Sequence, residues 1–362
     1  MIPTLLSSES PAALSSAAPS GPVSVIDDLP GAQWDRYVEQ HPDATIDHLS
    51  GWRHVFERVF HQRSAYLAAM RGGEVAGVLP LVLFRSLIFG RFAVSVPYLN
   101  YGGLLASDAT AAAALVDRAT TLAREFGASH VEFRHQRRQL PGAACREHKV
   151  RMVLDLPASS DDLWSGLDRK VRNQVRKAQK EGLTAVSGGA EHLASFYKVF
   201  SRNMRDLGTP VYPIDLFAEV LRTFDAGARI HLVHHRGEPV AAALTIRSGP
   251  TEVVPWASAL REHRSLCPNM LLYWSMLERA TAGGVRTFDF GRSSLNAGTH
   301  AFKLQWRARA IPLVWEYALL SASTAPEQGP ANPRFAFAIN AWTRLPLWVA
   351  NRIGPHLVSN IP

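Results

Sequence analysis

The chain has 362 residues, of which 47% are hydrophobic and 19% are charged, and its formal net charge is +8 at pH 7. This length exceeds that of a usual single hydrophobic core, so we expect two domains. Its two cysteines, Cys145 and Cys267, lack CxxC partners, which argues against a disulfide-rich secreted domain. The positive charge favours anionic partners such as phosphates, nucleic acid, acidic glycans or an anionic membrane face.

The first 22 residues are rich in Ser, Ala and Pro, and they have neither a basic n-region nor an uninterrupted apolar h-region. We therefore expect a disordered leader over 1–22 and not a signal peptide. No stretch reaches the ~20 apolar residues of a membrane span. These features favour a cytoplasmic protein, with peripheral contact at the inner face of the membrane as an option.

The segment 23–157 predicts a first domain of mixed helices and strands. Its loop VPYLNYGG, over 96–103, combines two tyrosines, an asparagine and two glycines. Tyr98, Asn100 and Tyr101 are candidates for an acceptor-side wall, and the alternative is a packed loop without a ligand. Periodicity predicts helices over 33–40, 49–61 and 108–126, and strands over 65–70, 75–83, 92–96, 130–134 and 151–156.

A basic helix begins the predicted second domain, 158–320, and is expected to open at Asp161. Its apolar positions recur at helical spacing, and the segment from Arg169 to Lys180 holds six cations and no acid. Such a run is typical of a solvated face. The functional alternative is a row of cations that binds a polyphosphate or nucleic-acid donor, with Arg172 and Arg176 as contacts.

The remainder of the second domain repeats the pattern of the first, which predicts a duplicated α/β domain. The tail over 321–362 mixes Trp, Phe and Leu with Arg, and it is expected to pack on a domain or on a membrane. Periodicity predicts helices over 190–207, 214–224 and 269–282, and strands over 183–187, 229–235, 239–248, 251–258 and 286–290.

The stretch FDFGRSSLNAGTHAFKLQW, over 288–306, joins a strand to a loop rich in Gly, Ser and Arg, and then to Lys303. Backbone N–H groups beside Arg292 and Lys303 favour an anionic ligand. The alternative is a surface turn without a ligand.

Several chemistries lack their signatures. His231, His234 and His235 alternate along a predicted strand without a further metal ligand nearby in sequence, so no metal site is expected. The chain has no P-loop, no GxGxxG after a strand and no GxSxG elbow. Transfer of an activated acyl group to an amine remains, because it needs positioning, oxyanion donors and a path for one proton, but no side-chain nucleophile.

Four motifs carry a resemblance to a known family: SRNMRDLGTPVYP (201–213), PNMLLYW (268–274), FDFGRSS (288–294) and GTHAFKLQW (298–306). In this order they resemble the FemAB-related proteins of PEP-CTERM/exosortase systems, which are Fem-type proteins with duplicated GNAT-like domains. The resemblance covers the chain from Val23 onward. It implies an α/β (α+β) fold of two tandem GNAT-like mixed-sheet domains, with substrates in the cleft.

The resemblance implies an N-acyltransferase acting on an exopolysaccharide or cell-envelope precursor. No tightly bound cofactor is expected, and acyl-CoA or aminoacyl-tRNA would be the co-substrate. The implied partners are an anionic acyl donor and a polysaccharide or peptide-type acceptor, with tRNA as a further option. Lys303, Arg292 and Asp289 are the catalytic candidates. The resemblance matches no particular residue to the acidic base of the classical Fem enzymes, and Asp289 is a candidate for that role from its place in the motif alone. The substrate-binding candidates are Tyr98, Asn100, Tyr101, Arg172, Arg176, Asn203, Arg205, Tyr212, Trp256, Asn269, Tyr273, Ser293 and Ser294.

The chain departs from the family pattern in two ways. It has no sustained heptads for the coiled-coil arm of some Fem proteins, and Arg307 follows Trp306 where the family usually has Gly. An alternative function from another class is a non-catalytic protein that binds an anionic polymer or a membrane surface.

Overall fold

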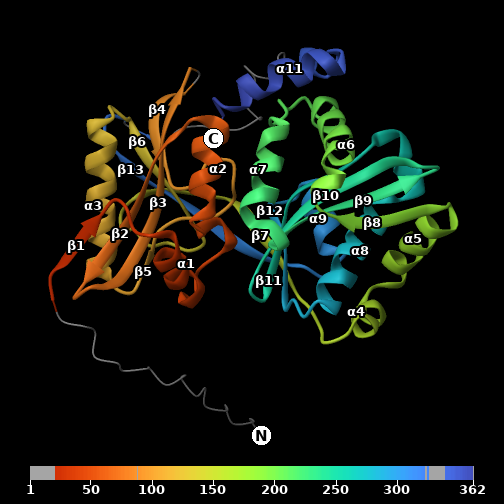
Figure 1. The fold of residues 1–362 in the computed structure, drawn as a ribbon, viewed down its shortest axis with the longest axis horizontal. Helices are drawn as coiled ribbons and strands as arrows, with labels where there is room; N and C mark the ends of the chain where they lie inside the picture. The colour runs from red at the N-terminus through yellow and green to blue at the C-terminus, as the bar shows by residue number, and fades with distance from the viewer. Residues whose placement is uncertain (1–20, 88, 323, 326–338, 362) are drawn as a thin grey trace, which may run out of the picture.

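The computed structural model describes residues 21–87, 89–322, 324, 325 and 339–361. Most of the leader expected over 1–22, and the part of the tail over 326–338, lie outside the described residues. The described chain has a mixed α/β fold, as predicted, built on one 13-stranded sheet (Figure 1). We refer to β1 through β7 as the first half and to α4 through β13 as the second half.

The first half contains every helix and strand that periodicity predicts there, with bounds that differ by a few residues, and β7 is longer than expected. Its elements are β1 (Val23–Ile26), α1 (Gly31–Gln40), α2 (Gly51–Phe60), β2 (Arg63–Arg71), β3 (Glu74–Ser86), β4 (Gly90–Val94), β5 (Leu105–Ala106), α3 (Ala109–Glu125), β6 (His130–His135) and β7 (Ala144–Asp155).

The second half repeats this arrangement and adds a central strand, β13, that we did not predict. Its elements are α4 (Ser160–Gly166), α5 (Arg169–Lys180), β8 (Leu183–Gly188), α6 (Leu193–Asp206), α7 (Ile214–Phe224), β9 (Ala228–His235), β10 (Glu238–Ser248), β11 (Thr251–Ala259), α8 (Pro268–Ala282), β12 (Thr287–Ser294), α9 (Gly298–Leu304) and β13 (Arg309–Leu319), followed by α11 (Leu347–Val358).

Two further expectations are wrong. The basic helix expected from Asp161 is divided into α4 and α5, because Leu167 takes an extended backbone with ψ 149° while its side chain stays buried. The loop expected after Phe290 is absent as such, because β12 continues through Ser294 along β7. Arg292 therefore lies on a strand, where its direction is set by the sheet.

The strands of the two halves belong to one hydrogen-bonded sheet. Its order is β1-β2-β3-β4-β6-β13-β7-β12-β11-β10-β9-β8, so β13 of the second half lies between β6 and β7 of the first. Each half has one short parallel pair, β4 with β6 and β11 with β12. Because strands cross between the halves, the domain boundaries expected at 157 and 320 remain predictions.

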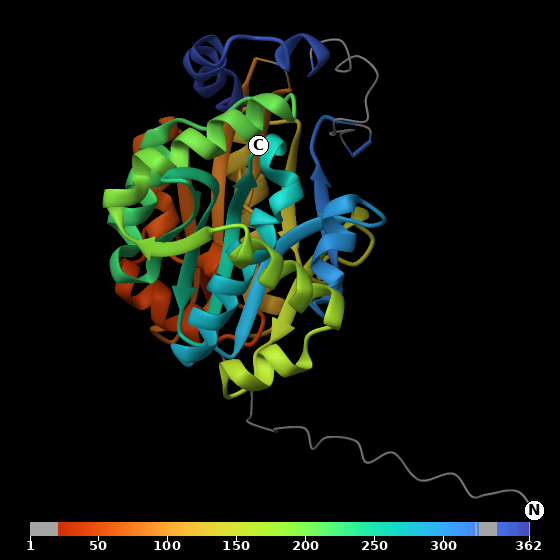
Figure 2. The same ribbon diagram turned by 90° about the vertical axis from the view of Figure 1, so that its right-hand side faces the viewer.

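Helices cover both faces of the sheet (Figures 1 and 2). On one face, α2 packs against α7, and a hydrophobic cluster runs from Trp52 and Phe56 through Tyr98 to Phe217 and Trp256. On the other face, α3 covers the first half, while α5 and α8 cover the second. The halves thus share an apolar core on the face of α2 and α7.

Helix α11 packs against α6 at one end of this shared core, and the residues that follow it reach the first half (Figure 1). The Asn360 backbone carbonyl accepts a hydrogen bond of 2.7 Å from Ser86 Oγ in the first half. Arg205 Nη1 in the second half donates to the Leu345 carbonyl at 2.9 Å. The tail, expected to pack on a domain or on membrane, therefore packs on both halves.

Gly354 of α11 provides a test of this attachment. A Cβ there would lie 2.8 Å from the Val211 backbone nitrogen, so we expect Gly354→Ala to loosen α11 and speed amide hydrogen exchange over 347–358. Gly298→Ala is the control, because a Cβ at Gly298 meets nothing within 4 Å. Unchanged exchange in Gly354→Ala would contradict the packing.

Candidate active site

A bulge in β12 places an acid and an arginine on the same face of the sheet. Asp289 pairs with Val153, and Arg292 pairs with Arg151. The two residues are three positions apart on β12, whereas their partners are two positions apart on β7. The extra residue falls beside Gly291, whose φ is +71°. Because side chains alternate along a strand, this insertion brings Asp289 and Arg292 to the same side.

Asp289 is buried, and both of its carboxylate oxygens accept hydrogen bonds. Its Oδ2 accepts hydrogen bonds from the Tyr101 hydroxyl and from Arg151 Nε, the latter at 2.8 Å, and its Oδ1 accepts from the Gly291 backbone N–H at 2.7 Å. Its exposed fraction is 1%. In this position Asp289 holds the bulge and Arg151, and its role as the base stays a prediction.

Arg292 is a half-buried cation without a hydrogen-bond acceptor among the described residues. Its guanidinium lies over the ring of Trp315 at 5.4 Å, and that of Arg134 lies over the same ring at 4.5 Å. Burial lowers the pKa of Arg292 to about 10, and the neighbouring Arg134 acts in the same direction, while Tyr212 and Glu132 oppose it. A cation in this setting favours an anionic ligand that supplies the missing acceptors.

Lys149 adds a further cation beside Arg292. Its Nζ donates a hydrogen bond of 2.6 Å to Ser294 Oγ, and burial followed by the charge of Arg292 lowers the pKa of Lys149. Ser293, the neighbouring candidate, is buried, and its Oγ has no hydrogen-bond partner in the part of the chain that the structure describes. Arg292, Lys149 and Ser294 form what we call the cationic site, at the junction of the two halves.

Lys303 supports this site from α9. Its Nζ donates to the Arg292 carbonyl at 2.9 Å and lies 3.4 Å from the Gly291 carbonyl, and the residue is 8% exposed. Burial lowers the pKa of Lys303 to about 8, Asp289 raises it, and Arg292 lowers it. In the structure Lys303 therefore binds the backbone of the bulge, and its contact with an anionic ligand stays a prediction.

The candidate wall over 96–103 reaches the bulge. Asp47 Oδ2 accepts from the backbone N–H groups of Asn100 and Tyr101, at 2.9 and 3.0 Å, and so fixes this loop. A Cβ built on Gly291 would lie 3.3 Å from Asn100 Nδ2. Asn100 and Tyr101 thus lie against β12 across the junction.

Tyr98 and Tyr212 lie together on the side of the junction nearest α11. Their ring centroids are 5.9 Å apart, and Tyr98 stacks on Phe60 at 4.2 Å. The Tyr98 hydroxyl donates to the Ser359 carbonyl at 3.3 Å. Burial raises the pKa of Tyr212, whereas Arg292 and Arg134 lower it, which places Tyr212 near both arginines.

Four other predicted residues hold the fold of the second half. Asn203 Nδ2 donates to Ser258 Oγ at 3.0 Å. Trp256 is 7% exposed and lies in the core shared by the halves. Tyr273 stacks on Phe290 at 5.6 Å. Arg205 binds the C-terminal segment, as described above.

The basic helix lies away from the cationic site. Helix α5 packs on α8 and β8 on the outer side of the second half (Figure 1). Arg176 is exposed and stacks over Trp164 at 5.4 Å, and Arg172 is half-buried. Asn269 is half-buried at the start of α8. The structure does not bring Arg172 and Arg176 to Arg292.

Sequence reasoning missed Arg134, Glu132, Lys149, Arg151 and Trp315. One signal could have found the first two: VEFR at the end of β6 resembles FDFGR in β12, with the inserted glycine as the difference. Arg134 Nε donates to Glu132 Oε1 at 2.8 Å, so the first half repeats the acid and the arginine but neutralises them as a pair.

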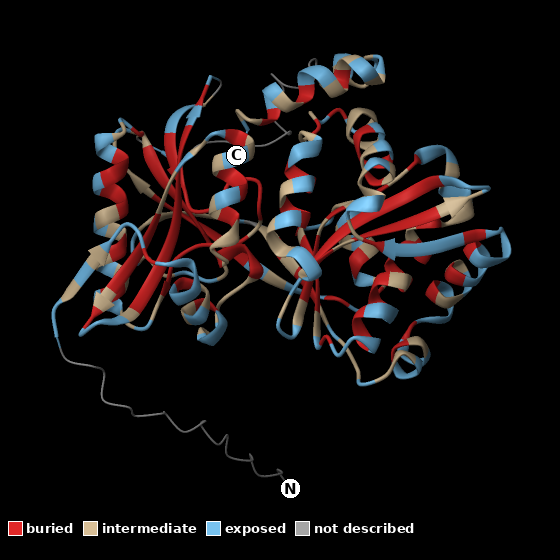
Figure 3. Ribbon diagram, in the orientation of Figure 1, coloured by how far each residue is buried: buried red, intermediate tan, exposed pale blue. Residues whose placement is uncertain are grey.

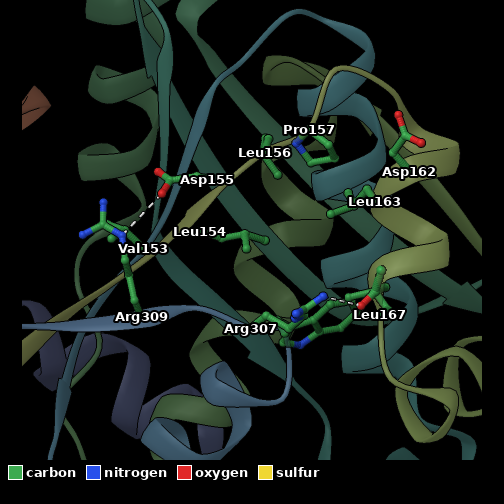
Figure 4. Close-up of a pocket in the computed structure, with 12 residues that line it drawn as sticks. Val153, Leu154, Asp155, Leu156, Pro157, Asp162, Leu163, Leu167, Arg307 and Arg309 are labelled. Carbon is green, nitrogen blue, oxygen red and sulfur yellow. Dashed lines mark hydrogen bonds and ion pairs between the residues drawn. The ribbon is translucent and has the colours of Figure 1, made fainter. Parts of the chain in front are cut away.

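A separate pocket of about 430 Å³ lies at the other end of β7, between α4 and the residues that follow α9 (Figure 4). Arg309 approaches Asp155 there at 3.4 Å, and Arg307 Nη1 donates to the Gly166 carbonyl at 2.9 Å. Arg307 has a φ of +65°, a backbone conformation that Gly adopts more readily than any other residue. Asp155 is six residues beyond Lys149, or roughly 20 Å along the strand, so this pocket is distinct from the cationic site.

Replacing Arg292 tests how much its unpaired charge destabilises the folded protein. We expect Arg292→Met to raise the free energy of unfolding by about 1–2 kcal/mol, because it removes a partly desolvated cation without an acceptor. Urea denaturation at pH 7 measures this change. The control is Arg134→Met, which breaks a buried pair and should destabilise by about 3 kcal/mol or more. Destabilisation by both variants would contradict an unpaired Arg292.

The lowered pKa of Lys303 predicts a pH dependence of stability. The unfolded lysine titrates near its usual 10.5 and the folded one near about 8, so the unfolded state binds more protons between these values. Stability from this group therefore rises with pH over that window. Urea denaturation at pH 7.5 and 9.5 should show a smaller rise in Lys303→Met than in the unaltered protein. Equal rises would contradict the shift.

Comparison with known proteins agrees with this architecture. Residues 167–304 match the family described as Acetyltransferase (GNAT) domain. No curated protein matches the chain. The crystal structure of FemX superposes with a TM-score of 0.64 at 17% identity, covering 82% of this chain and 98% of that one.

Two further structures share the fold. A tandem GNAT protein from the clavulanic acid biosynthesis pathway has a TM-score of 0.53 at 15% identity, covering 85% of this chain and 100% of that one. L-PGS from Bacillus licheniformis has a TM-score of 0.55 at 12% identity, covering 87% of this chain and 97% of that one. The chain thus carries a GNAT-type acyltransferase domain in its second half, within the tandem GNAT-like fold that the sequence predicts.

Proposed function

We propose that the protein transfers an acyl or aminoacyl group from an anionic donor to an amine of an exopolysaccharide or cell-envelope precursor. The observation that carries this proposal is Arg292, a partly buried cation at the junction of the halves that has no acceptor among the described residues. Lys149 and Ser294 lie beside it. An anionic group of the donor would satisfy Arg292 and offset its desolvation.

The strands around the site offer backbone groups to the donor. Strands β11 and β12 pair only from Thr251 with Thr287 to Val253 with Asp289. Beyond these residues β12 pairs with β7 and β11 with β10, so the edges that face each other form no ladder in the described part of the chain. An extended, amide-containing donor arm would pair with such an edge, and an edge N–H would stabilise the oxyanion.

The reaction needs no covalent enzyme intermediate. The acceptor nitrogen attacks the acyl carbonyl, a C–N bond forms, and the C–S bond of a thioester or the C–O bond of an ester breaks. One proton leaves the nitrogen, and the leaving thiol or hydroxyl gains one. In this scheme Arg292 and Lys149 bind the donor, and Asp289 and Lys303 hold the bulge that aims Arg292.

Acyl-CoA and aminoacyl-tRNA both present phosphates, so both remain donor candidates. We place the protein in the cytoplasm, because both donors are found there. The link to a PEP-CTERM/exosortase system rests on the four motifs quoted above. Mass spectrometry of the envelope polymer or its lipid-linked precursor, with and without the gene, would identify the acceptor, and Lys303→Ala should change that polymer if the assignment is correct.

A non-catalytic binding protein is the second candidate function. It is favoured by α5, whose cations Arg169, Lys170, Arg176, Lys177 and Lys180 are exposed with no acid among them. Binding of an anionic polymer would then fall steeply with salt and depend on Arg172 and Arg176, with no dependence on Arg292 or Lys303. Loss of function in the Arg292 and Lys303 variants alone would exclude it.

A transfer assay separates the two functions. Purified protein is supplied with labelled acyl-CoA or charged tRNA and an envelope extract, and transfer is measured as kcat/KM. We expect Arg292→Gln to lower it roughly 10–100-fold, because a charge-assisted hydrogen bond to the donor is lost. Arg176→Gln, a matched control on α5, should change it less than about twofold. No transfer from either donor would remove the support for the enzyme.

A further inference from the structure

The exposed side of α11 and the β3–β4 turn together make up what we call the tail face. The two segments are joined, because the Leu87 backbone N–H donates to Asn360 Oδ1 at 2.9 Å. Figure 3 shows exposed residues along the outer side of α11. The exposed apolar members of the tail face are Leu87, Trp348, Ile353, Leu357 and Ile361.

The tail face holds the two most exposed large apolar side chains in the described part of the chain. Leu87 is 92% exposed and Trp348 is 73% exposed. Ile353 and Leu357 add 42% and 36% from the same helix. Single exposed apolar side chains are ordinary on a soluble protein, but this grouping marks an interaction surface.

The charges of the tail face identify its partner. The stretch 339–361 contains Arg344, Arg352 and His356, all of them exposed, and no acid. Trp, Leu and Ile interleaved with Arg suit the headgroup region of a bilayer that contains anionic lipids. We infer that the tail face binds an anionic phospholipid bilayer.

The attachment is peripheral and preformed. No helix of the described residues is long and apolar enough to cross a membrane. The inner side of α11 is already packed, with Ala350, Gly354 and Val358 buried against the protein. The helix is therefore already folded before it meets the membrane, and its outer side is held in a fixed orientation.

This placement bears on the acceptor, a consequence that rests on the proposed function. Tyr98 contacts the carbonyl of Ser359 directly, so the junction with Tyr212 and Arg292 lies beneath the C-terminal segment. A helix is ~10 Å across, so a docked protein would hold this junction close to the headgroups. A lipid-linked acceptor would then reach the cationic site without leaving the bilayer.

Vesicle co-sedimentation tests the inference with the full chain. We expect binding to vesicles of phosphatidylcholine with 30% phosphatidylglycerol at 0.1 M salt, and little binding to pure phosphatidylcholine or at 0.5 M salt. Arg352→Glu should lower the partition coefficient at least ~fivefold, and the double variant Leu87→Ser, Trp348→Ser should lower it similarly. Absence of binding to the anionic vesicles would overturn the inference.

Matched controls lie elsewhere on the surface. Val186→Ser removes an apolar side chain that is 40% exposed on β8, and Lys177→Glu reverses a charge on α5. Both should bind as the unaltered protein does. An equal loss in Lys177→Glu would assign binding to α5, and a dimer abolished by Trp348→Ser would assign the face to a second copy. Vesicle binding does not require transfer, so the two proposals fail independently.

Discussion

The positive charge of Arg292 enters the junction of the two halves while the acid that shares its face, Asp289, is occupied by Arg151 and Tyr101. The arrangement depends on the bulge, because in a regular strand two residues three positions apart, such as Asp289 and Arg292, would point to opposite faces. The surroundings do not neutralise the cation, and burial lowers its pKa to about 10. A site that keeps a charge unpaired loses stability and gains affinity for an anion.

The first half contains a corresponding acid and arginine, but there the two side chains bind each other. Glu132 and Arg134 lie two residues apart without a bulge, bind each other and are both 1% exposed. Arg134 also donates to the carbonyls of Val96 and Leu99, each at 2.9 Å. Its hydrogen bonds therefore stabilise the loop over 96–103 of its own half. The arginine of the first half is therefore structural, whereas that of the second half remains open to a ligand.

The sequence predicted the fold class and most elements, because their apolar periods are strong and local. It missed the break between α4 and α5, since the apolar period continues through Leu167 without a helix breaker. It also missed β13, whose place depends on partners far along the chain. Arg292 and Asp289 were found as site candidates, but the bulge, Arg134 and Trp315 follow from strand pairing that periodicity does not report.

The insertion of β13 between β6 and β7 restricts how the molecule can move. In many two-lobed enzymes the lobes are joined by flexible linkers and close on their substrate as a hinge. Here a rotation of one half against the other would break ladder hydrogen bonds along β13, each of which costs free energy to leave unpaired. Substrate access to the junction therefore depends on movements of side chains and of the C-terminal segment over Tyr98. The strands around the site would keep their arrangement when a substrate binds.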